Sequence, residues 1–270
     1  MEEVINGILI REVETKNIMT KSSLPVGGYS VNPYVGCTHA CKYCYASFMK
    51  RFTGHKEEWG TFLDVKHWPE IKNPKKYAGQ RVVIGSVTDG YNPQEEQFGN
   101  TRKLLEQLIG SDADILICTK SDLVVRDLDL LKKLGRVTVS WSINTLDENF
   151  KNDMDSASSI ERRIAAMKQV YEAGIRTVCF VSPVFPGITN FEAIFERVKI
   201  EIFEPEQIAL ILYPLKDRFK IRDTGEYRGY ETDRTDTCFI YLLHSRNTAL
   251  NARSRVHVVL EIFIQCVDRP

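Results

Sequence analysis

The stretch Cys37-Thr-His-Ala-Cys-Lys-Tyr-Cys44 decides the fold and the chemistry that this chain is expected to have. Its three cysteines have the spacing C-x3-C-x2-C, and the next cysteine along the chain is Cys118. Cysteine thiolates bind the irons of iron–sulfur clusters, so three of them can hold three irons of a cubane. The fourth iron then lacks a protein ligand and can bind a small molecule, as the open position of a catalytic metal does. The spacing predicts a [4Fe–4S] cluster on Cys37, Cys41 and Cys44.

Other uses of these cysteines fit the pattern less well. A structural zinc site takes four ligands, usually in two halves, and here only His39 inside the loop could complete the set. A zinc-binding interaction module therefore stays an alternative. A ferredoxin-type electron carrier needs four cysteines for each cluster. Seven cysteines, an odd number, without an export signal do not indicate a disulfide framework.

Length and composition are those of a globular enzyme. The chain has 270 residues, of which 43% are apolar and 27% are charged, enough to bury the core of one domain. Basic and acidic residues balance at 36 each, so no overall field attracts polyanions. The apolar runs are too short to span a bilayer, and an air-sensitive cluster predicts a reducing cytoplasm.

Apolar extended runs alternate with helical patterns along the chain, which predicts parallel strands joined by crossover helices. Six such steps are fewer than the eight of a closed barrel, so we expect an α/β fold with an open, partial (β/α)6 TIM-like barrel. The core should cover 30–213, after a lead-in over 1–29 and before an irregular C-terminal segment, 214–270. The expected strands are 30–34, 82–84, 115–118, 137–143, 177–181 and 208–212, and the expected helices are 97–109, 127–134, 159–173 and 191–203.

An aromatic residue, Tyr43, stands directly before the third cysteine. Together with the cysteine spacing, it resembles the radical S-adenosylmethionine (radical SAM) superfamily. The resemblance implies that the open iron chelates the amino and carboxylate groups of SAM. It also implies that an electron from a donor such as flavodoxin or ferredoxin cleaves SAM to a 5′-deoxyadenosyl radical, which abstracts hydrogen from an unidentified substrate.

Further segments resemble the spore photoproduct lyase-related branch of this superfamily, and most closely the group called radical SAM mobile pair protein B. The similarity covers roughly residues 15–213. It implies that Lys120 holds the SAM carboxylate and Ser142 contacts the ribose, and that a second radical SAM protein, mobile pair protein A, is a partner. The matching segments are 31–45, 85–93, 119–131, 142–147 and 161–190.

The lyase returns a hydrogen atom from a cysteine beside its second-strand motif. Here residues 86–89 read Ser-Val-Thr-Asp, and no cysteine lies between Cys44 and Cys118. DNA photoproduct repair is therefore an alternative that rests on kinship, as does nucleic-acid binding. For hydrogen return, Cys118 at the end of a strand and Tyr45 after the cysteine loop are the candidates, whereas Cys179 is expected to be core.

Polar residues follow the expected strands, at the edge where such folds collect their chemistry. SAM needs an acceptor for its ammonium, a cation for its carboxylate and partners for its ribose. We assign these roles to seven residues: Tyr43, Thr88, Asp89, Lys120, Ser142, Asn144 and Arg163. Each also has a simpler interpretation, such as a turn for Asp89, a solvated side chain for Lys120 and a helix-surface position for Arg163. Cys238 and Cys266 lack cluster spacing.

Overall fold

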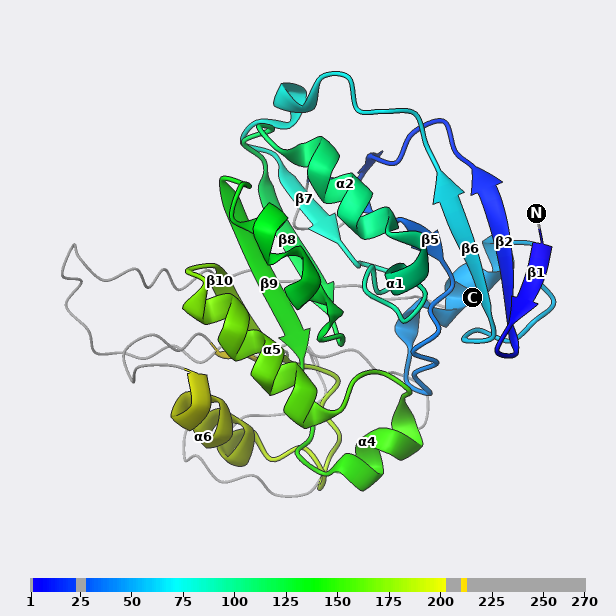
Figure 1. The fold of residues 1–270 in the computed structure, drawn as a ribbon. Helices are drawn as coiled ribbons and strands as arrows, with labels where there is room; N and C mark the ends of the chain where they lie inside the picture. Colours follow the sequence, from blue (N-terminus) through cyan, green and yellow to red (C-terminus); the bar gives the residue numbers. More distant parts are fainter. Residues whose placement is uncertain (1, 23–27, 203–209, 213–270) are drawn as a thin grey trace.

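Figure 1 shows a computed structural model of the chain, which describes residues 2–22, 28–202 and 210–212. The expected C-terminal segment, 214–270, lies outside these residues, and so do Cys238 and Cys266.

The larger of two sheets contains the six expected parallel strands. Five consecutive pairs of neighbours are parallel and follow the order of the chain, and one short strand pairs antiparallel at the edge. This mixed sheet with crossover connections is an α/β fold. Its strands are, in spatial order, β3 (Thr20–Lys21), β4 (Tyr29–Val31), β7 (Arg81–Ile84), β8 (Asp114–Thr119), β9 (Arg136–Ser142), β10 (Arg176–Val181) and β11 (Leu210–Leu212).

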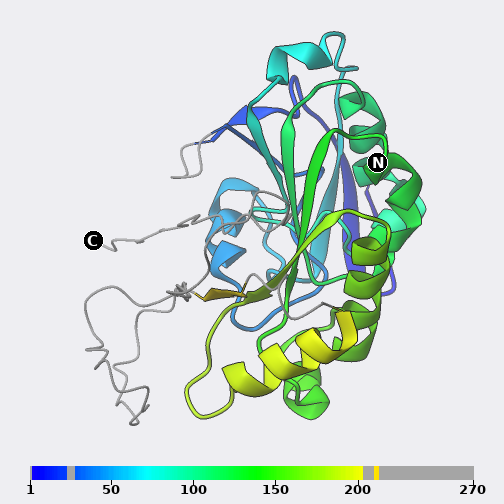
Figure 2. The ribbon, with the colours of Figure 1, turned by 90° about the vertical axis from the view of Figure 1, so that its left-hand side faces the viewer.

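The helices that follow the strands cover one face of this sheet (Figures 1 and 2). They are α2 (Asn100–Leu108), α3 (Leu128–Leu131), α5 (Ile160–Glu172) and α6 (Phe191–Ile202). Alternate strand residues such as Ile117 and Trp141 are buried in the core with helix residues such as Met167. The other alternate positions, among them Ser140 and its register partner Cys118, therefore point to the opposite face.

Short elements occupy the connections. The light blue 3-10 helix η1 lies on the side of the sheet opposite the yellow and green helices (Figure 2). These connecting elements are η1 (Tyr45–Phe52), η2 (Pro74–Tyr77), α1 (Glu95–Phe98), η3 (Leu123–Asp127) and α4 (Glu148–Met154).

A second sheet was not expected from the sequence. Its order is β1 (Glu2–Ile5), β2 (Ile8–Glu14), β6 (Phe62–His67) and β5 (Tyr34–Val35). The lead-in is thus mostly strand, and the expected strand over 30–34 is divided between the two sheets. Pro33 stands at the division, and a proline has no N–H for a strand ladder.

Two expected helices were also too long. The helix expected over 97–109 is divided into α1 and α2 at Gly99, whose φ of +63° is left-handed and interrupts a helix. The helix expected over 127–134 begins as the 3-10 turn η3 and is α-helical only over Leu128–Leu131. The other two, α5 and α6, have nearly the predicted bounds.

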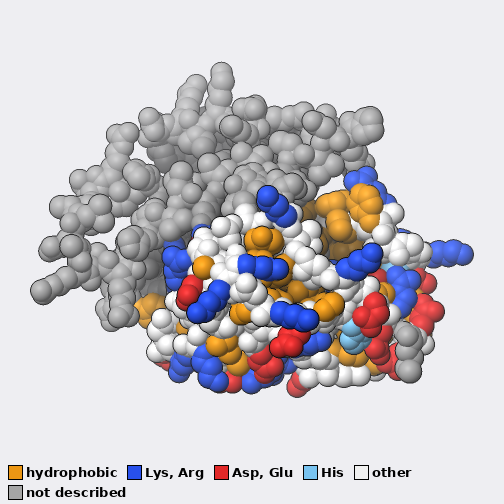
Figure 3. Space-filling model, turned by 90° about the horizontal axis from the view of Figure 1, so that it is seen from above, with side chains coloured by type: hydrophobic (Ala, Val, Ile, Leu, Met, Phe, Trp, Pro, Cys, Tyr) orange, Lys and Arg blue, Asp and Glu red, His pale blue; other side chains and the backbone are white. Residues whose placement is uncertain are grey.

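Figure 3 looks onto the edge at which β7, β8 and β9 begin. Lys and Arg side chains there are interspersed with Asp, Glu and apolar ones, and Arg81 pairs with Asp114 at 2.7 Å. The exposed Lys72, Lys75 and Lys76 belong to the connection before β7, far from the carboxyl ends of the strands. Within the described ranges, no helix combines the length and apolar character that crossing a membrane requires.

Candidate functional site

The cysteine loop leaves β5 through Gly36, a position where any other residue would be strained. Gly36 has φ +87°, and a Cβ atom there would lie 2.4 Å from the carbonyl oxygen of Phe62. The loop then turns twice, with Ala40 N donating to Cys37 O at 3.2 Å and Cys44 N donating to Cys41 O at 3.1 Å. All three cysteines carry free thiols. Gly36 thus sets the loop against β6.

Three hydrogen bonds hold the middle of the loop in place. The Nε2 atom of His39 lies 3.1 Å from the Oδ2 atom of Asp89, which is in the loop after β7. The backbone carbonyl of His39 accepts from Ser156 N at 2.8 Å, and Lys42 N donates to Met154 O at 2.9 Å. The His39 side chain is buried, so its bond to Asp89 is shielded from water. The loop is therefore fixed between the ends of β7 and α4.

Asp89 connects the cysteine loop to the end of β8. Its Oδ1 accepts from Tyr91 N at 2.9 Å and Thr119 Oγ1 at 2.8 Å, and its Oδ2 also accepts from Lys120 N at 2.7 Å. Burial acts to raise the pKa of Asp89, but His39 and these donors outweigh it and lower the pKa to about 2. Asp89 is thus ionised, and both of its oxygens already have protein partners.

Lys120 and Tyr43 meet beside this carboxylate. The Lys120 ammonium lies 5.8 Å from the centroid of the Tyr43 ring, a cation–π distance. Burial acts to lower the pKa of Lys120, yet the nearby Tyr43 and Cys41 raise it above its ordinary value. Lys120 is therefore a cation next to the cysteine loop, as the prediction for the SAM carboxylate requires.

Asp155 joins Tyr43 to a buried arginine. The Tyr43 hydroxyl donates to Asp155 Oδ2 at 2.8 Å, and Arg163 Nη2 donates to Asp155 Oδ1 at 2.9 Å. Arg163 is 1% exposed and donates further to Ser158 O at 2.8 Å and Ser142 O at 3.1 Å. Arg163 is therefore inside the protein rather than on a helix surface, and its three nitrogens bind protein oxygens. The sequence analysis missed Asp155, because it lies in no recognisable motif.

The remaining predicted site residues lie at the same edge of the sheet. Ser142 ends β9 half-buried, and the Nδ2 atom of the buried Asn144 has no hydrogen-bond partner among the described residues. Thr88, 2% exposed, likewise has an unpartnered hydroxyl in the described part of the chain. The Tyr45 hydroxyl donates to Ser86 O after β7, and Cys118 is half-buried near the end of β8.

The chemistry of the loop fits a cluster. Burial, the largest influence, raises the pKa of Cys37, and it also raises that of Cys41, where Lys120 acts in the opposite direction. In the residues that the structure describes, no three His, Cys, Asp or Glu side chains are placed to share a single metal ion. A cubane makes no such demand, because each thiolate binds a different iron. Positive iron and the adjacent Lys120 would both favour the thiolate forms.

The fold is similar to that of solved structures of spore photoproduct lyase variants. One solved structure, spore photoproduct lyase with bound AdoMet and dinucleoside spore photoproduct, matches with a TM-score of 0.56 and 18% identity, over 71% of this chain and 57% of that one. A second structure of the lyase matches with a TM-score of 0.55 and 19% identity, over 86% of this chain and 73% of that one. Identities this low establish similarity of fold alone.

Sequence comparison identifies the family. An uncharacterised protein of Methanocaldococcus jannaschii is 38% identical over 194 residues, which are 71% of this chain and 74% of that protein. The radical SAM Nalpha-GlyT isomerase of Pseudomonas phage M6 is 26% identical over 180 residues, 64% of this chain and 36% of that protein. The family model of the radical SAM superfamily matches residues 31–198, more than half of the chain. This chain belongs to the radical SAM superfamily.

Proposed function

We propose that Cys37, Cys41 and Cys44 hold the [4Fe–4S] cluster with which this radical SAM enzyme cleaves SAM. Membership of the radical SAM superfamily implies the two cofactors, a [4Fe–4S] cluster and SAM. The observation that carries the assignment of residues is the bond between His39 and Asp89, because it fixes the three-cysteine loop over the polar ends of β7 and β8. When bound, the cluster and SAM supply a 5′-deoxyadenosyl radical that abstracts a hydrogen atom.

Lys120 is the proposed partner of the SAM carboxylate. It is cationic, lies beside the cysteine loop and carries no ion pair to a carboxylate within the described residues. Ser142 and Asn144 are the proposed ribose contacts, and the unpartnered amide of Asn144 supports a polar ligand at the end of β9. Each side chain then meets one polar group of the cofactor.

Three predicted SAM contacts have a different proposed role. Asp89 orients the Lys120 backbone and the cysteine loop, while Arg163 holds Asp155. Asp155 in turn fixes the Tyr43 ring against which Lys120 rests. These groups set the position of the lysine without themselves needing to touch SAM. Thr88, with its unpartnered hydroxyl, remains available to a ligand.

The sheet face opposite the helices is the proposed place for the substrate, inside an open, partial barrel over residues 30–213. Cys118 points to this face, since it stands in register with Ser140. The Tyr45 hydroxyl donates to Ser86 O in the loop after β7. Either side chain could return a hydrogen atom to the product, and both remain proposals.

A spectroscopic titration tests the residue assignment. The full chain is reconstituted without oxygen, reduced with dithionite and examined by electron paramagnetic resonance with and without SAM. We expect a [4Fe–4S]⁺ spectrum that changes on adding SAM, and the same cluster without the SAM-induced change at ordinary concentrations in Lys120→Met. Cys41→Ala should lose the spectrum. An unchanged spectrum in Cys41→Ala would reject the ligand set.

Two other functions stay open to test. A DNA photoproduct lyase-like activity draws on the fold similarity to spore photoproduct lyase, but residues 86–89 contain no cysteine. Conversion of dinucleoside spore photoproduct, with DNA binding that weakens as salt rises, would support it. Zinc without inorganic sulfide in the purified protein would instead support the zinc-binding interaction module.

Partners beyond SAM are also proposals. Reduction of the cluster calls for a one-electron donor such as flavodoxin or ferredoxin, in a reducing cytoplasm. Kinship with radical SAM mobile pair protein B would add mobile pair protein A as a partner, although none of the relatives described above carries that name. Co-purification of a second radical SAM protein from the native source would support it.

A further inference from the structure

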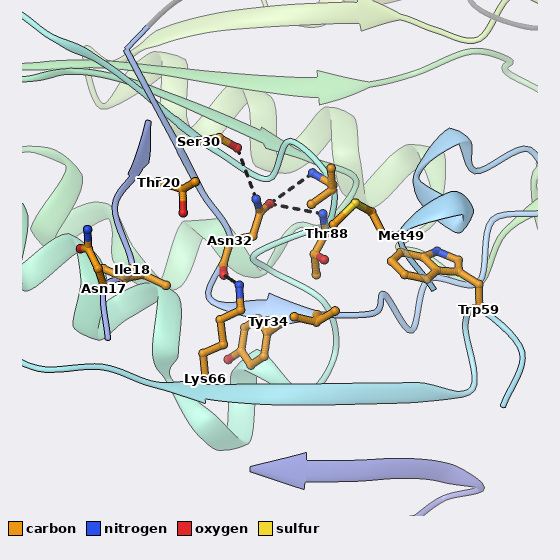
Figure 4. A pocket seen from close by; sticks show the side chains of 12 residues that line it. Asn17, Ile18, Thr20, Ser30, Asn32, Tyr34, Met49, Trp59, Lys66 and Thr88 are labelled. Atoms are coloured by element: carbon orange, nitrogen blue, oxygen red, sulfur yellow. Dashed lines mark hydrogen bonds between the residues drawn. The ribbon is translucent and has the colours of Figure 1, made fainter. Parts of the chain in front are cut away.

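A cavity of about 260 Å³ lies between the two sheets, and Figure 4 shows the side chains that line it. They come from β3, β4, β5, β6 and η1, from the loop after β7, and from the connections that precede β3, β5 and β6. None of the described residues that line it is Asp or Glu. The polar lining residues are Asn17, Thr20, Ser30, Asn32, Lys66 and Thr88.

Two hydrogen-bonding groups of this cavity have no partner in the described part of the chain. One is the hydroxyl of Thr88, which is 2% exposed, and the other is the indole Nε1 of Trp59. Leaving a buried donor unpaired is unfavourable, because the donor has lost its hydrogen bond to water. Figure 4 shows Thr88 pointing from its loop toward the strand that carries Lys66. The Thr88 hydroxyl, on the side of the cavity that faces Lys66, is therefore a donor for an acceptor atom of a ligand.

Lys66 adds a cation without a direct counter-ion. Its ammonium donates to Asn32 O at 2.9 Å, which uses one of three donors, and no carboxylate in the described ranges pairs with it. Asp64, on the same face of β6, is already paired with Arg11 at 2.9 Å. Burial lowers the pKa of Lys66, with Asp64 acting the other way. An anion in the cavity would therefore be attracted to an incompletely compensated charge.

The remaining walls are apolar and partly aromatic. Met49 and Trp59 lie at one end, Asn17 and Ile18 at the other, and the Tyr34 ring lies between them (Figure 4). Flat apolar walls suit a ring of similar size. A single lysine, with no arginine fork beside it, matches the one charge of a carboxylate better than the two of a phosphate.

We propose that this cavity binds a ring-sized ligand through a carboxylate held by Lys66 and Thr88, with the ring lying toward Met49 and Trp59. That this ligand is the substrate, or a part of it, rests on the proposed function. The cavity is linked to the cysteine loop by two consecutive residues. Thr88 lines the cavity, and the next residue, Asp89, holds the cysteine loop through His39. The cavity and the carboxylate that holds the cysteine loop are therefore adjacent along the chain.

Isothermal titration of the reconstituted full chain, in the absence of SAM and reductant, tests the cavity. The probes are benzoate, its neutral isostere benzamide, and phenyl phosphate. We expect benzoate to bind at least about tenfold more tightly than benzamide, and more tightly than phenyl phosphate. Lys66→Met should weaken benzoate at least about tenfold, and Thr88→Val, which keeps the side-chain shape, severalfold. The exposed Lys72→Met should bind benzoate as the unaltered chain does.

Equal binding of benzoate and benzamide, or undiminished benzoate binding in both folded Lys66→Met and Thr88→Val, would overturn the proposal. Tighter binding of phenyl phosphate would overturn the carboxylate assignment. Circular dichroism shows whether each variant has folded, and Thr88→Val remains informative if Lys66→Met does not fold. Because no SAM is turned over in this titration, its result is independent of whether the chain forms 5′-deoxyadenosine.

Discussion

The imidazole of His39 and the carboxylate of Asp89 lie 3.1 Å apart, and their side chains are only 2% and 9% exposed. This contact joins the loop that carries the three cysteines to the loop after β7. Asp89 also holds the first residues after β8 through Thr119 and Lys120. One carboxylate therefore sets both the proposed cluster ligands and the proposed SAM lysine.

Replacing this carboxylate should loosen the whole site. We expect Asp89→Asn to lower the free energy of unfolding by about 3 kcal/mol, since removing one partner of a buried pair leaves the other uncompensated. Urea unfolding of the cluster-free chain measures this. The control is Asp129→Asn, which breaks a solvent-exposed pair with Arg102 and should therefore cost much less. Similar losses in both variants would contradict the account.

A methyl group at the entrance of the cysteine loop should displace it. Gly36→Ala places a Cβ atom 2.4 Å from a backbone oxygen of β6 and also adopts a left-handed φ. Gly79→Ala has a similar φ of +69° but meets nothing within 4 Å, so it isolates the backbone cost of about 1–2 kcal/mol. We expect Gly36→Ala to cost clearly more in thermal unfolding and to bind less iron and sulfide. Equal costs would show that the contact with β6 is unimportant.

The Asp155 cluster should make stability depend on acid pH. Burial acts to raise the pKa of Asp155, but Arg163 and the Tyr43 hydroxyl lower it overall. A carboxyl with a lowered folded pKa stabilises the protein above its unfolded pKa, about 3.9, and loses that contribution as pH falls through the lower folded value. Between pH 6 and 3, Asp155→Asn should therefore lose less stability than the unaltered chain. Thermal unfolding of both proteins at each pH measures this. An equal loss of stability in the two proteins between pH 6 and 3 would contradict the prediction.

Lys120 should control SAM affinity and leave the cluster intact. We expect Lys120→Met to weaken SAM binding to the reconstituted protein at least about tenfold, because a carboxylate in a half-buried site loses its cation. Equilibrium dialysis with labelled SAM measures the affinity, and iron analysis confirms equal cluster content. Lys132→Met, an exposed lysine after α3, is the matched control. Unchanged affinity in Lys120→Met would remove it from the site.

The sequence predicted the parts of this molecule that local pattern specifies. The strands β7 to β10 are short apolar runs, and α5 is preceded by the N-cap residue Ser159, whose side chain accepts from Arg162 N. The second sheet was missed because β2 pairs with β6 across a long sequence separation, which no local pattern reports. Its strand β5 was not predicted separately, because β5 follows β4 so closely that the two read as one strand, although Pro33 divides them.

The site shows the same division between local and distant information. Motif spacing brought out the cysteine loop, Asp89 and Lys120, and the structure places them together. It did not reveal that Asp89 is saturated by protein donors or that Arg163 is buried against Asp155, since both facts depend on packing between distant segments. The cavity at Lys66 likewise needs both sheets in place.

Formation of 5′-deoxyadenosine shows whether the three-cysteine loop supports cleavage of SAM. The oxygen-free, reconstituted chain is given dithionite and SAM, and the product is quantified by liquid chromatography and mass spectrometry beside Cys41→Ala and the core variant Cys179→Ala. We expect 5′-deoxyadenosine from the unaltered chain and from Cys179→Ala, and none from Cys41→Ala. No 5′-deoxyadenosine from the unaltered chain when its cluster is intact, or equal amounts from Cys41→Ala, would contradict this expectation.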